Sequence, residues 1–245
     1  MDARSYQQYL DEADDWLKRG RARLLGLLVE RHARRGEELE LLEVGAGAGQ
    51  NLPTLARFGK VDAIEVHPLG REAIAARGIA RSVFTEGVPF ELDRQYDVIC
   101  ALDVIEHLPD DRAALDWMAA RLRPSGVLVL TVPAYAWLFS EHDRILGHFR
   151  RYTRGQLVAA LPRSVDLLAA AYFGHFIFPP AVAARAAWAL GRRLRGGPTS
   201  KQGSPKGGLA ARVLGGALDA ELALVRRGYR PPFGLSVFAV ARRAE

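Results

Sequence analysis

The stretch LELLEVGAGAGQN, residues 39–51, decides the fold of this chain of 245 residues. An apolar run ends at Val44, and glycine then occupies every second position, at Gly45, Gly47 and Gly49. This order predicts a buried strand, a tight turn and the N-terminus of a helix. Glycine suits such a turn because the backbone must bend sharply and a ligand must approach it closely. A helix N-terminus would add unpaired N–H groups and a partial positive charge.

The spacing of the glycines distinguishes between two classes of nucleoside ligand. A dinucleotide-binding turn has the pattern G-x-G-x-x-G, and Gln50 stands where that pattern needs its third glycine. The pattern G-x-G-x-G, with Glu43 before it, resembles motif I of the class I, Rossmann-like methyltransferases that use S-adenosylmethionine (SAM), in the broad type 11/23 group. The resemblance implies that the turn wraps the methionine and ribose parts of SAM, and that S-adenosylhomocysteine (SAH) is the product.

Later motifs follow in the order expected for that family. Glu65 ends an apolar run 20 residues after Gly45, where a carboxylate can accept the ribose hydroxyls of a nucleoside. The run DVIEH, residues 103–107, resembles the family motif D/E-x-x-E-H, and RPSGVLVLTV, residues 123–132, resembles R-L-K-P-G-G-x-L-x-L-x-V. The resemblance implies a set of cofactor contacts: Glu43, Gly45, Ala46, Gly47, Gly49, Asn51, Glu65, Val66, Gly87, Val88, Leu102, Asp103 and His107.

Periodicity and the resemblance together predict a three-layer αβα fold of the Rossmann-like type, with seven strands and the last strand antiparallel. We expect a leading lid helix in 1–36, a SAM-binding core in 37–173, a basic helical insertion in 174–232 and a closing strand in 233–245. Expected strands follow the first one at 61–66, 79–84, 96–102, 127–132, 164–172 and 234–241. Expected helices are 5–34, 50–58, 68–77, 111–123, 153–161, 181–194 and 209–227, with a flexible linker at 195–208.

Composition limits the class of protein. The chain is 49% hydrophobic and 25% charged, which is ordinary for a globular domain. Its single cysteine, Cys100, excludes an internal disulfide and a multi-cysteine metal site. The acidic, polar N-terminus does not resemble a signal peptide, so we expect a cytoplasmic protein. Residues 167–184 carry no formal charge, but a glycine, a histidine and two prolines argue against a membrane span.

The positive charge is concentrated in one segment. The net charge is +6, and residues 181–230 hold ten basic and two acidic residues. Such a segment indicates contact with an anionic partner, such as the inner face of a membrane, or simply a solvated arginine-rich helix face. Nucleic acid is disfavoured because the segment has few aromatic residues to stack bases. We therefore expect SAM to methylate an oxygen or nitrogen, or else a carbon, of a small-molecule or lipid-linked acceptor, while RNA methylation and a non-catalytic SAM-binding protein remain alternatives.

The segment PAYAWLFSEHDRILGHFRRY, residues 133–152, follows a core strand and is dense in aromatic and titratable residues. Loops at such positions commonly carry binding and catalysis. His142, beside Asp143, is the first candidate general base and His148 the second, although each could serve only as a structural hydrogen-bonding group. Asp103 is expected to border the methyl-transfer site. The predicted substrate contacts are Tyr135, Trp137, Arg150, Arg151 and Tyr152, and the two arginines could instead pair with Asp143 and Glu141.

The DVIEH run admits a second interpretation. Some small-RNA 2′-O-methyltransferases hold a metal with a similar run and a distant histidine. Asp103, Glu106 and His107, completed by His142 or His148, would be the corresponding ligands for Mg²⁺ or Mn²⁺. Most members of the family carry this run without a metal. We therefore expect no metal, and a structural role for Glu106 and His107 in fixing the loop.

Overall fold

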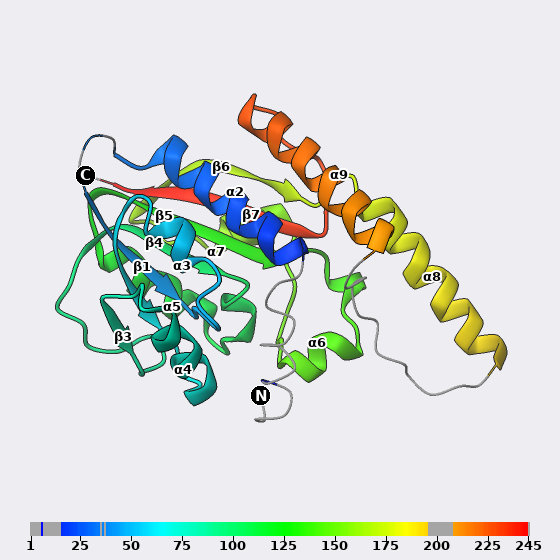
Figure 1. The fold of residues 1–245 in the computed structure, drawn as a ribbon, viewed down its shortest axis with the longest axis horizontal. Coiled ribbons are helices and arrows are strands. Elements are labelled where there is room, and N and C mark those ends of the chain that lie inside the picture. The colour runs from blue at the N-terminus through cyan, green and yellow to red at the C-terminus, as the bar shows by residue number, and fades with distance from the viewer. Residues whose placement is uncertain (1–5, 7–15, 35, 37, 196–207, 245) are drawn as a thin grey trace.

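The computed structural model of the chain describes residues 6, 16–34, 36, 38–195 and 208–244. One mixed sheet forms its centre, with the strand order β3-β2-β1-β4-β5-β7-β6 (Figure 1). The last strand in the chain, β7, runs antiparallel to both of its neighbours. The strands are β1 Leu39–Val44, β2 Gly59–Ile64, β3 Ser82–Phe84, β4 Tyr96–Leu102, β5 Leu122–Pro133, β6 Val165–Phe173 and β7 Ser236–Arg243. The predicted seven-stranded αβα fold is confirmed.

Helices cover both faces of the sheet and divide the core into two layers. Buried side chains of α2, α3, α4 and α9 pack on one face, and those of α5 and α7 pack on the other. The central strand β4 is almost fully buried, as expected of a strand covered on both sides. The helices are α2 Trp16–His32, α3 Leu52–Leu55, α4 Pro68–Arg77, α5 Asp111–Ala120, α6 Glu141–Leu146, α7 Arg154–Ala160, α8 Phe178–Arg195 and α9 Gly208–Arg226, with short turns η1 Ile105–His107 and η2 Ala136–Leu138.

Two elements differ from the sequence expectation. The helix expected at 50–58 is only the four-residue α3, because the chain must already turn at Phe58, whose carbonyl accepts the Leu39 N–H, to enter β2. The turn expected at 123–126 lies inside β5, where the pairing with β4 shifts register and Ser125 takes a positive φ of 63°. The carboxyl ends of β1 and β4 lie where expected, and β2 ends at Ile64, two residues before the expected end of its strand.

The insertion is packed against the rest of the fold. In Figure 1, α9 lies beside α2, and α8 extends past the end of the sheet. Gly20 of α2 lets the two helices approach closely, because a Cβ there would lie 2.6 Å from the Leu218 side chain. The predicted boundaries between lid, core, insertion and closing strand remain predictions, and most of the linker, 196–207, lies outside the described residues. Within the described helices, no segment is both long and apolar enough to cross a membrane.

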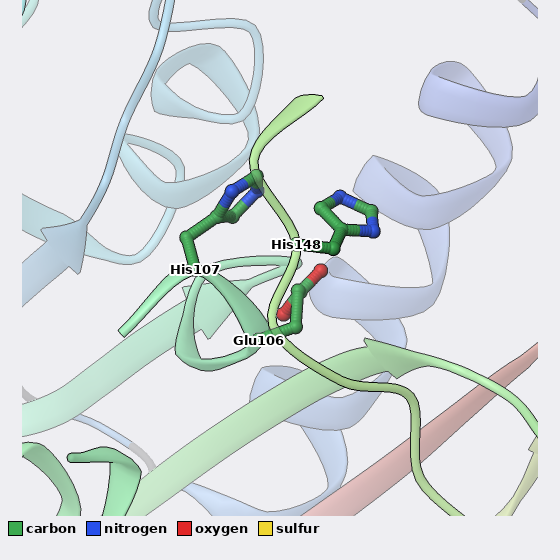
Figure 2. Close-up of side chains that lie close together, drawn as sticks. All are labelled: Glu106, His107 and His148. Carbon is green, nitrogen blue, oxygen red and sulfur yellow. The ribbon is translucent and has the colours of Figure 1, made fainter. Parts of the chain in front are cut away.

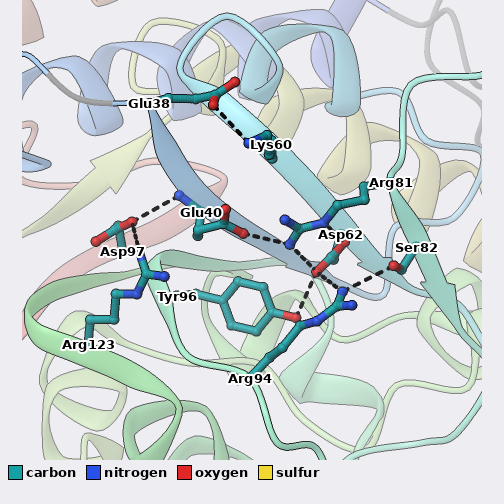
Figure 3. A network of polar contacts seen from close by, with 10 residues as sticks. All are labelled: Glu38, Glu40, Lys60, Asp62, Arg81, Ser82, Arg94, Tyr96, Asp97 and Arg123. Carbon is teal, nitrogen blue, oxygen red and sulfur yellow. Dashed lines mark hydrogen bonds and ion pairs between the residues drawn. The ribbon is translucent and has the colours of Figure 1, made fainter.

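A polar network fixes the sheet where its strands begin (Figure 3). Asp62 of β2 is buried and binds the guanidinium group of Arg81 through both carboxylate oxygens, at 2.9 and 2.7 Å. The same carboxylate accepts hydrogen bonds from Arg94 at 2.9 Å and from Tyr96 Oη at 3.0 Å. These contacts connect β2, β3 and β4 at the edge of the sheet where the strands begin. The opposite edge, where the strands end, holds none of these contacts and is the one to examine for ligand binding.

Candidate functional site

The glycine turn follows β1 and has the backbone that the sequence predicts. Gly45, Gly47 and Gly49 have φ angles of 67°, 58° and 68°, a region that side chains disfavour. A Cβ at Gly45 would also lie 2.6 Å from the side chain of Val104. The turn therefore needs glycine at position 45 both for its backbone conformation and for its approach to the segment after β4.

Glu65, one residue after β2, holds this turn in place. Its Oε2 accepts the Gly47 N–H at 2.7 Å, and its Oε1 accepts the His67 N–H at 2.7 Å. A carboxylate has about four acceptor positions, so two remain for ribose hydroxyls. Val66 beside it is 58% exposed and lies next to Gly87, in the loop that also contains Val88. This arrangement supports the predicted nucleoside contacts.

Glu43 lies under the turn, within β1. Its Oε1 accepts a hydrogen bond from Asn51 Nδ2 at 2.6 Å, and its Oε2 has no partner among the described residues. Burial, opposed by this bond, raises the pKa of Glu43 to about 8. Glu43 is therefore neutral at pH 7 and offers one unsatisfied polar atom at the site.

Asp103 marks the end of β4, directly after Leu102. Its φ is 55°, a strained conformation for a residue with a side chain and one that is common at functional sites. Its Oδ1 accepts from Thr131 Oγ1 at 3.2 Å, and its Oδ2 pairs with Arg21 Nη1 at 2.8 Å. Arg21 belongs to α2, so the leading helix reaches the site. Nothing in the sequence indicated Arg21, because it is one of several basic residues in the second half of its helix.

Glu106 and His107, shortly after Asp103 in the chain, come together with His148 (Figure 2). Glu106 is fully buried, and burial together with Asp103 raises the pKa of Glu106 well above its usual value. Burial and the neighbouring His148 lower the pKa of His107 to about 4, so this imidazole is neutral. The two histidine rings meet edge to face, with centroids 4.5 Å apart.

Asp143 organises the segment that carries His148. Its carboxylate binds His148 Nδ1 at 2.8 Å and Arg151 at 2.7 and 3.0 Å. These contacts, with Ser140, hold the pKa of Asp143 far below its usual value despite burial, so Asp143 is ionised. His148 is therefore the histidine that Asp143 holds, while His142 lies exposed on α6. The base roles predicted for the two histidines are untested.

The predicted substrate residues fall into two groups. Arg151 is bound to Asp143, Arg150 pairs with Asp111 at 2.9 Å, and Tyr152 Oη donates to the same Asp111 at 2.6 Å. Arg151 thus has one of the expected alternative partners, whereas Arg150 pairs with Asp111 in place of Asp143 or Glu141. Their predicted contact with substrate stays a prediction.

Tyr135 and Trp137 belong instead to an aromatic cluster at the carboxyl end of β5. Tyr135 stacks on Tyr172 and on Trp137, with ring centroids 5.2 and 5.7 Å apart. Phe178 in the insertion and Phe233 directly after it extend the cluster, and Trp137 is 64% exposed. The contributions of Tyr172, Phe178 and Phe233 were not predicted, although the aromatic run before Pro179 was a visible signal.

Comparison with known proteins assigns the fold and family. The methyltransferase domain family matches residues 11–187. A ubiquinone biosynthesis O-methyltransferase of Paramagnetospirillum magneticum is 34% identical over 110 residues, which cover 41% of this chain and 44% of the relative. One from Parvibaculum lavamentivorans is 30% identical over 138 residues, covering 51% and 54%. The chain thus spans about half the length of these curated relatives.

Solved structures extend the likeness over the whole fold. The N-methyltransferase NodS from Bradyrhizobium japonicum, in complex with SAH, has a TM-score of 0.57 and 18% identity, with 98% of this chain and 99% of that chain covered. The plantazolicin methyltransferase BpumL, also with SAH, has a TM-score of 0.60 and 11% identity, with 99% and 90% covered. With the glycine turn, Glu65 and the seven-stranded sheet in place, this chain belongs to the methyltransferase domain family, in its class I, Rossmann-like and SAM-dependent form.

Proposed function

We propose that this chain transfers the methyl group of SAM to an oxygen or nitrogen of a small-molecule or lipid-linked acceptor, with an aromatic oxygen acceptor favoured. The observation that carries the proposal is the glycine turn held by Glu65 beside Asp103, at the carboxyl ends of neighbouring strands. In such a transfer the acceptor attacks the methyl carbon in line, and sulfur leaves with the bonding electron pair. The protein mainly aligns the two reactants, which can supply about 7–11 kcal/mol.

The aromatic cluster supports the choice of acceptor. Tyr135, Trp137 and Phe178 form a largely aromatic surface that directly follows β5, at the same edge of the sheet as Asp103. Aromatic side chains bind aromatic rings by offset stacking and edge contacts. The curated relatives named as O-methyltransferases support oxygen as the attacking atom. Asp103, His148 and His142 remain the proposed polar groups near the acceptor.

A two-stage experiment tests this proposal. Calorimetric titration with SAM, SAH and NAD first establishes the cofactor, and we expect SAM and SAH to bind while NAD does not. Transfer of labelled methyl from SAM is then measured to phenols, catechols, polyprenylated phenols, amines and RNA. Label on phenolic acceptors supports the proposal. NAD binding without SAM binding refutes it, and label on RNA alone would favour the basic insertion as an RNA-binding element.

A non-catalytic, SAM-binding regulatory role is the alternative from a different functional class. It predicts SAM binding without transfer to any acceptor class. Substitution of Asp103 or His142 would then leave the cellular role intact. Complementation of a deletion strain with Asp103→Asn and His142→Gln separates the two, because an enzyme with these groups at its site should lose function.

Peripheral contact with an anionic membrane through 181–230 is the second proposal for this chain. On α9, Leu209 is 77% exposed and Val213 is 62% exposed, with exposed Arg212 between them. An apolar, arginine-edged helix face of this kind suits the surface of an anionic bilayer. Such contact would place the enzyme at the inner face of the membrane, near a lipid-linked acceptor. Flotation with phosphatidylglycerol vesicles should succeed at low salt, and failure at every salt concentration would remove the proposal.

A further inference from the structure

One arginine of the insertion lies beside the aromatic cluster. Arg185 belongs to α8 and donates from Nη1 to the carbonyl oxygen of Leu138, in the turn η2, at 2.8 Å. Leu138 directly follows Trp137, a member of the cluster. Phe178, seven residues before Arg185 on the same helix, has its ring centroid 5.5 Å from that of Tyr135. Residues seven apart lie on one face of a helix, so α8 presents an aromatic ring and a guanidinium group on the same side.

The guanidinium group of Arg185 makes few contacts within the protein. A guanidinium group has several N–H donors, and the carbonyl of Leu138 is the only acceptor that Arg185 binds in the described part of the chain. No carboxylate of that part lies within ion-pair distance of Arg185, although its side chain is half-buried. Charges that are removed from water are normally paired. The structure therefore leaves donors of Arg185 available to an anion.

Positive charge exceeds negative charge around Arg185. Its charged neighbours are Arg151 and Asp143. Asp143 already binds Arg151 through both carboxylate oxygens, at 2.7 and 3.0 Å. Burial and then Arg151 lower the pKa of Arg185, and Asp143 opposes them without cancelling their effect. Two guanidinium groups thus lie near one carboxylate, and an anion from outside the protein would balance the second.

The other two arginines of this region are already paired. Arg150 binds Asp111 at 2.9 Å and the carbonyl oxygen of Pro109 at 2.7 Å. Arg151 binds Asp143 and the carbonyl oxygen of Ala134. The sequence pointed to these two arginines as the clamp for an anionic substrate group. The structure favours Arg185 for that role.

Arg185 also lies near the predicted methyl-transfer region. Its neighbour Arg151 is close enough to Glu106 to stabilise the charged form of that carboxyl group, and so is Arg21. Arg21 in turn pairs with Asp103 at 2.8 Å. These charged side chains form one continuous group at the edge of the sheet where the strands end. A ligand bound by Arg185 would therefore lie beside the region assigned to the acceptor.

We propose that Arg185 binds an anionic oxygen group of the acceptor, a carboxylate or a phosphate, while the aromatic cluster binds the ring of the acceptor. This inference rests on the proposed function, because it names the chemical class of acceptor for the same site. A guanidinium group binds carboxylates and phosphates through two parallel N–H donors. Seven residues of a helix span about 10 Å, and helix side chains lean toward the N-terminus, so Arg185 leans toward Phe178. The exposed ring of Trp137 offers a surface for stacking.

Matched acceptors separate binding of the anionic group from binding of the ring. Methyl transfer from SAM is measured to a catechol carboxylate, a catechol phosphonate and neutral methylcatechol. We expect the wild type to prefer an anionic catechol to methylcatechol by at least about tenfold in kcat/KM, mainly through a lower KM. Preference for the carboxylate indicates a small acidic acceptor. Preference for the phosphonate indicates a phosphate-linked acceptor.

Substitution of Arg185 tests whether this residue causes the preference. Arg185→Gln keeps a donor for the Leu138 carbonyl but removes the charge, and should reduce the preference to less than about twofold by raising the KM of the anionic catechol. Arg185→Lys should restore part of the preference, because lysine keeps the charge but not the paired donors. Arg163→Gln, at an exposed position before β6, removes the same charge and should keep the wild-type preference. Circular dichroism checks that each variant is folded.

Binding measured without turnover separates this inference from the proposed function. The three catechols are titrated into the SAH-loaded full chain. Tighter binding of an anionic catechol that is lost in Arg185→Gln and kept in Arg163→Gln supports the inference, even if no methyl group is transferred. Methyl transfer to neutral and anionic catechols with equal kcat/KM supports the proposed function and overturns the inference. A preference that persists in Arg185→Gln also overturns it, as does the absence of binding by both anionic catechols.

Discussion

Buried carboxylates differ in their hydrogen bonding between the edge of the sheet where the strands begin and the edge where they end. Where the strands begin, Asp62 receives contacts from two guanidinium groups and a phenol hydroxyl (Figure 3). Where they end, Glu43 has one oxygen without a partner and Glu106 has two, among the described residues. The first edge stabilises the fold, and the second keeps polar atoms available for ligands. Substitutions of matched side chains at the two edges should therefore separate stability from binding.

The largest effect is expected from neutralising the carboxylate at the edge where the strands begin. Asp62→Asn removes the charge that faces Arg81 and Arg94, and should lower the free energy of unfolding by about 3 kcal/mol. Glu43→Gln is the matched change at the other edge, and should not lower stability at pH 7, because folding of the wild type must protonate Glu43 and folding of the variant need not. Denaturant unfolding of both variants measures the difference. Equal losses would show that the two edges do not differ.

The glycine turn should show the reverse pattern, with a large effect on binding. Gly45→Ala places a Cβ against Val104 in a backbone with positive φ, and should weaken SAM binding about a hundredfold. Gly78→Ala is the control, because Gly78 has a similar φ of 62° with open space around it. That control should cost about 1–2 kcal/mol of stability and leave SAM affinity unchanged. Calorimetric titration measures the SAM affinity of both variants. A wild-type affinity in Gly45→Ala would contradict the assigned cofactor site.

A smaller binding effect is expected at the acceptor of the ribose hydroxyls. Glu65→Gln keeps the shape of the side chain but removes the charge, and should weaken SAM binding about tenfold. Glu72→Gln, an exposed position on the neighbouring helix α4, is the matched control and should bind like the wild type. The comparison uses SAM and SAH in parallel, since both carry the ribose. Unchanged affinity in Glu65→Gln would remove Glu65 from the cofactor site.

The last prediction concerns how stability changes per pH unit. The pKa of Glu43 is raised to about 8 in the folded chain, against an ordinary value of 4.5. The folded state therefore keeps this proton up to a higher pH than the unfolded state does. The stabilising contribution of Glu43 is full below about pH 4.5 and is lost as the pH rises to about 8. The slope from this group is at most about 1.4 kcal/mol per pH unit. Glu43→Gln should make the free energy of unfolding less dependent on pH between pH 5 and 8. An unchanged dependence on pH would show that Glu43 is ionised in the folded chain.

Local signals were sufficient for the cofactor half of the molecule. The apolar run of β1 and the three glycines after it predicted a strand and a tight turn, and the structure has both, with positive φ at all three glycines. The run ending at Glu65 gave the second strand and the carboxylate that holds the turn. Thr153 and Asp110 are residue types that favour helix N-caps, and their side chains cap α7 and α5. These features depend on backbone conformation and short-range periodicity, which a sequence displays directly.

Side-chain partners from distant segments could not be predicted in the same way. Arg21 reaches Asp103 from α2, and Asp143 binds His148, five residues later in the chain. The aromatic cluster joins Tyr135 to Phe178 and Phe233, which lie in and after the insertion. Each pairing depends on how helices and loops pack at the end of the sheet, and sequence spacing carries no information about that geometry.

By itself, the sequence determined the seven-stranded fold, the glycine turn and the position of Glu65, because strand and turn propensities act over a few residues. The tertiary structure alone decided which polar groups are satisfied and which remain open. It paired Asp62 with two arginines, and it left both oxygens of buried Glu106 without a partner beside two histidines. The physical reason is that burial and pairing are properties of the space between packed elements. The charge state of a carboxylate therefore depends on the groups that surround it once the helices and strands have packed together.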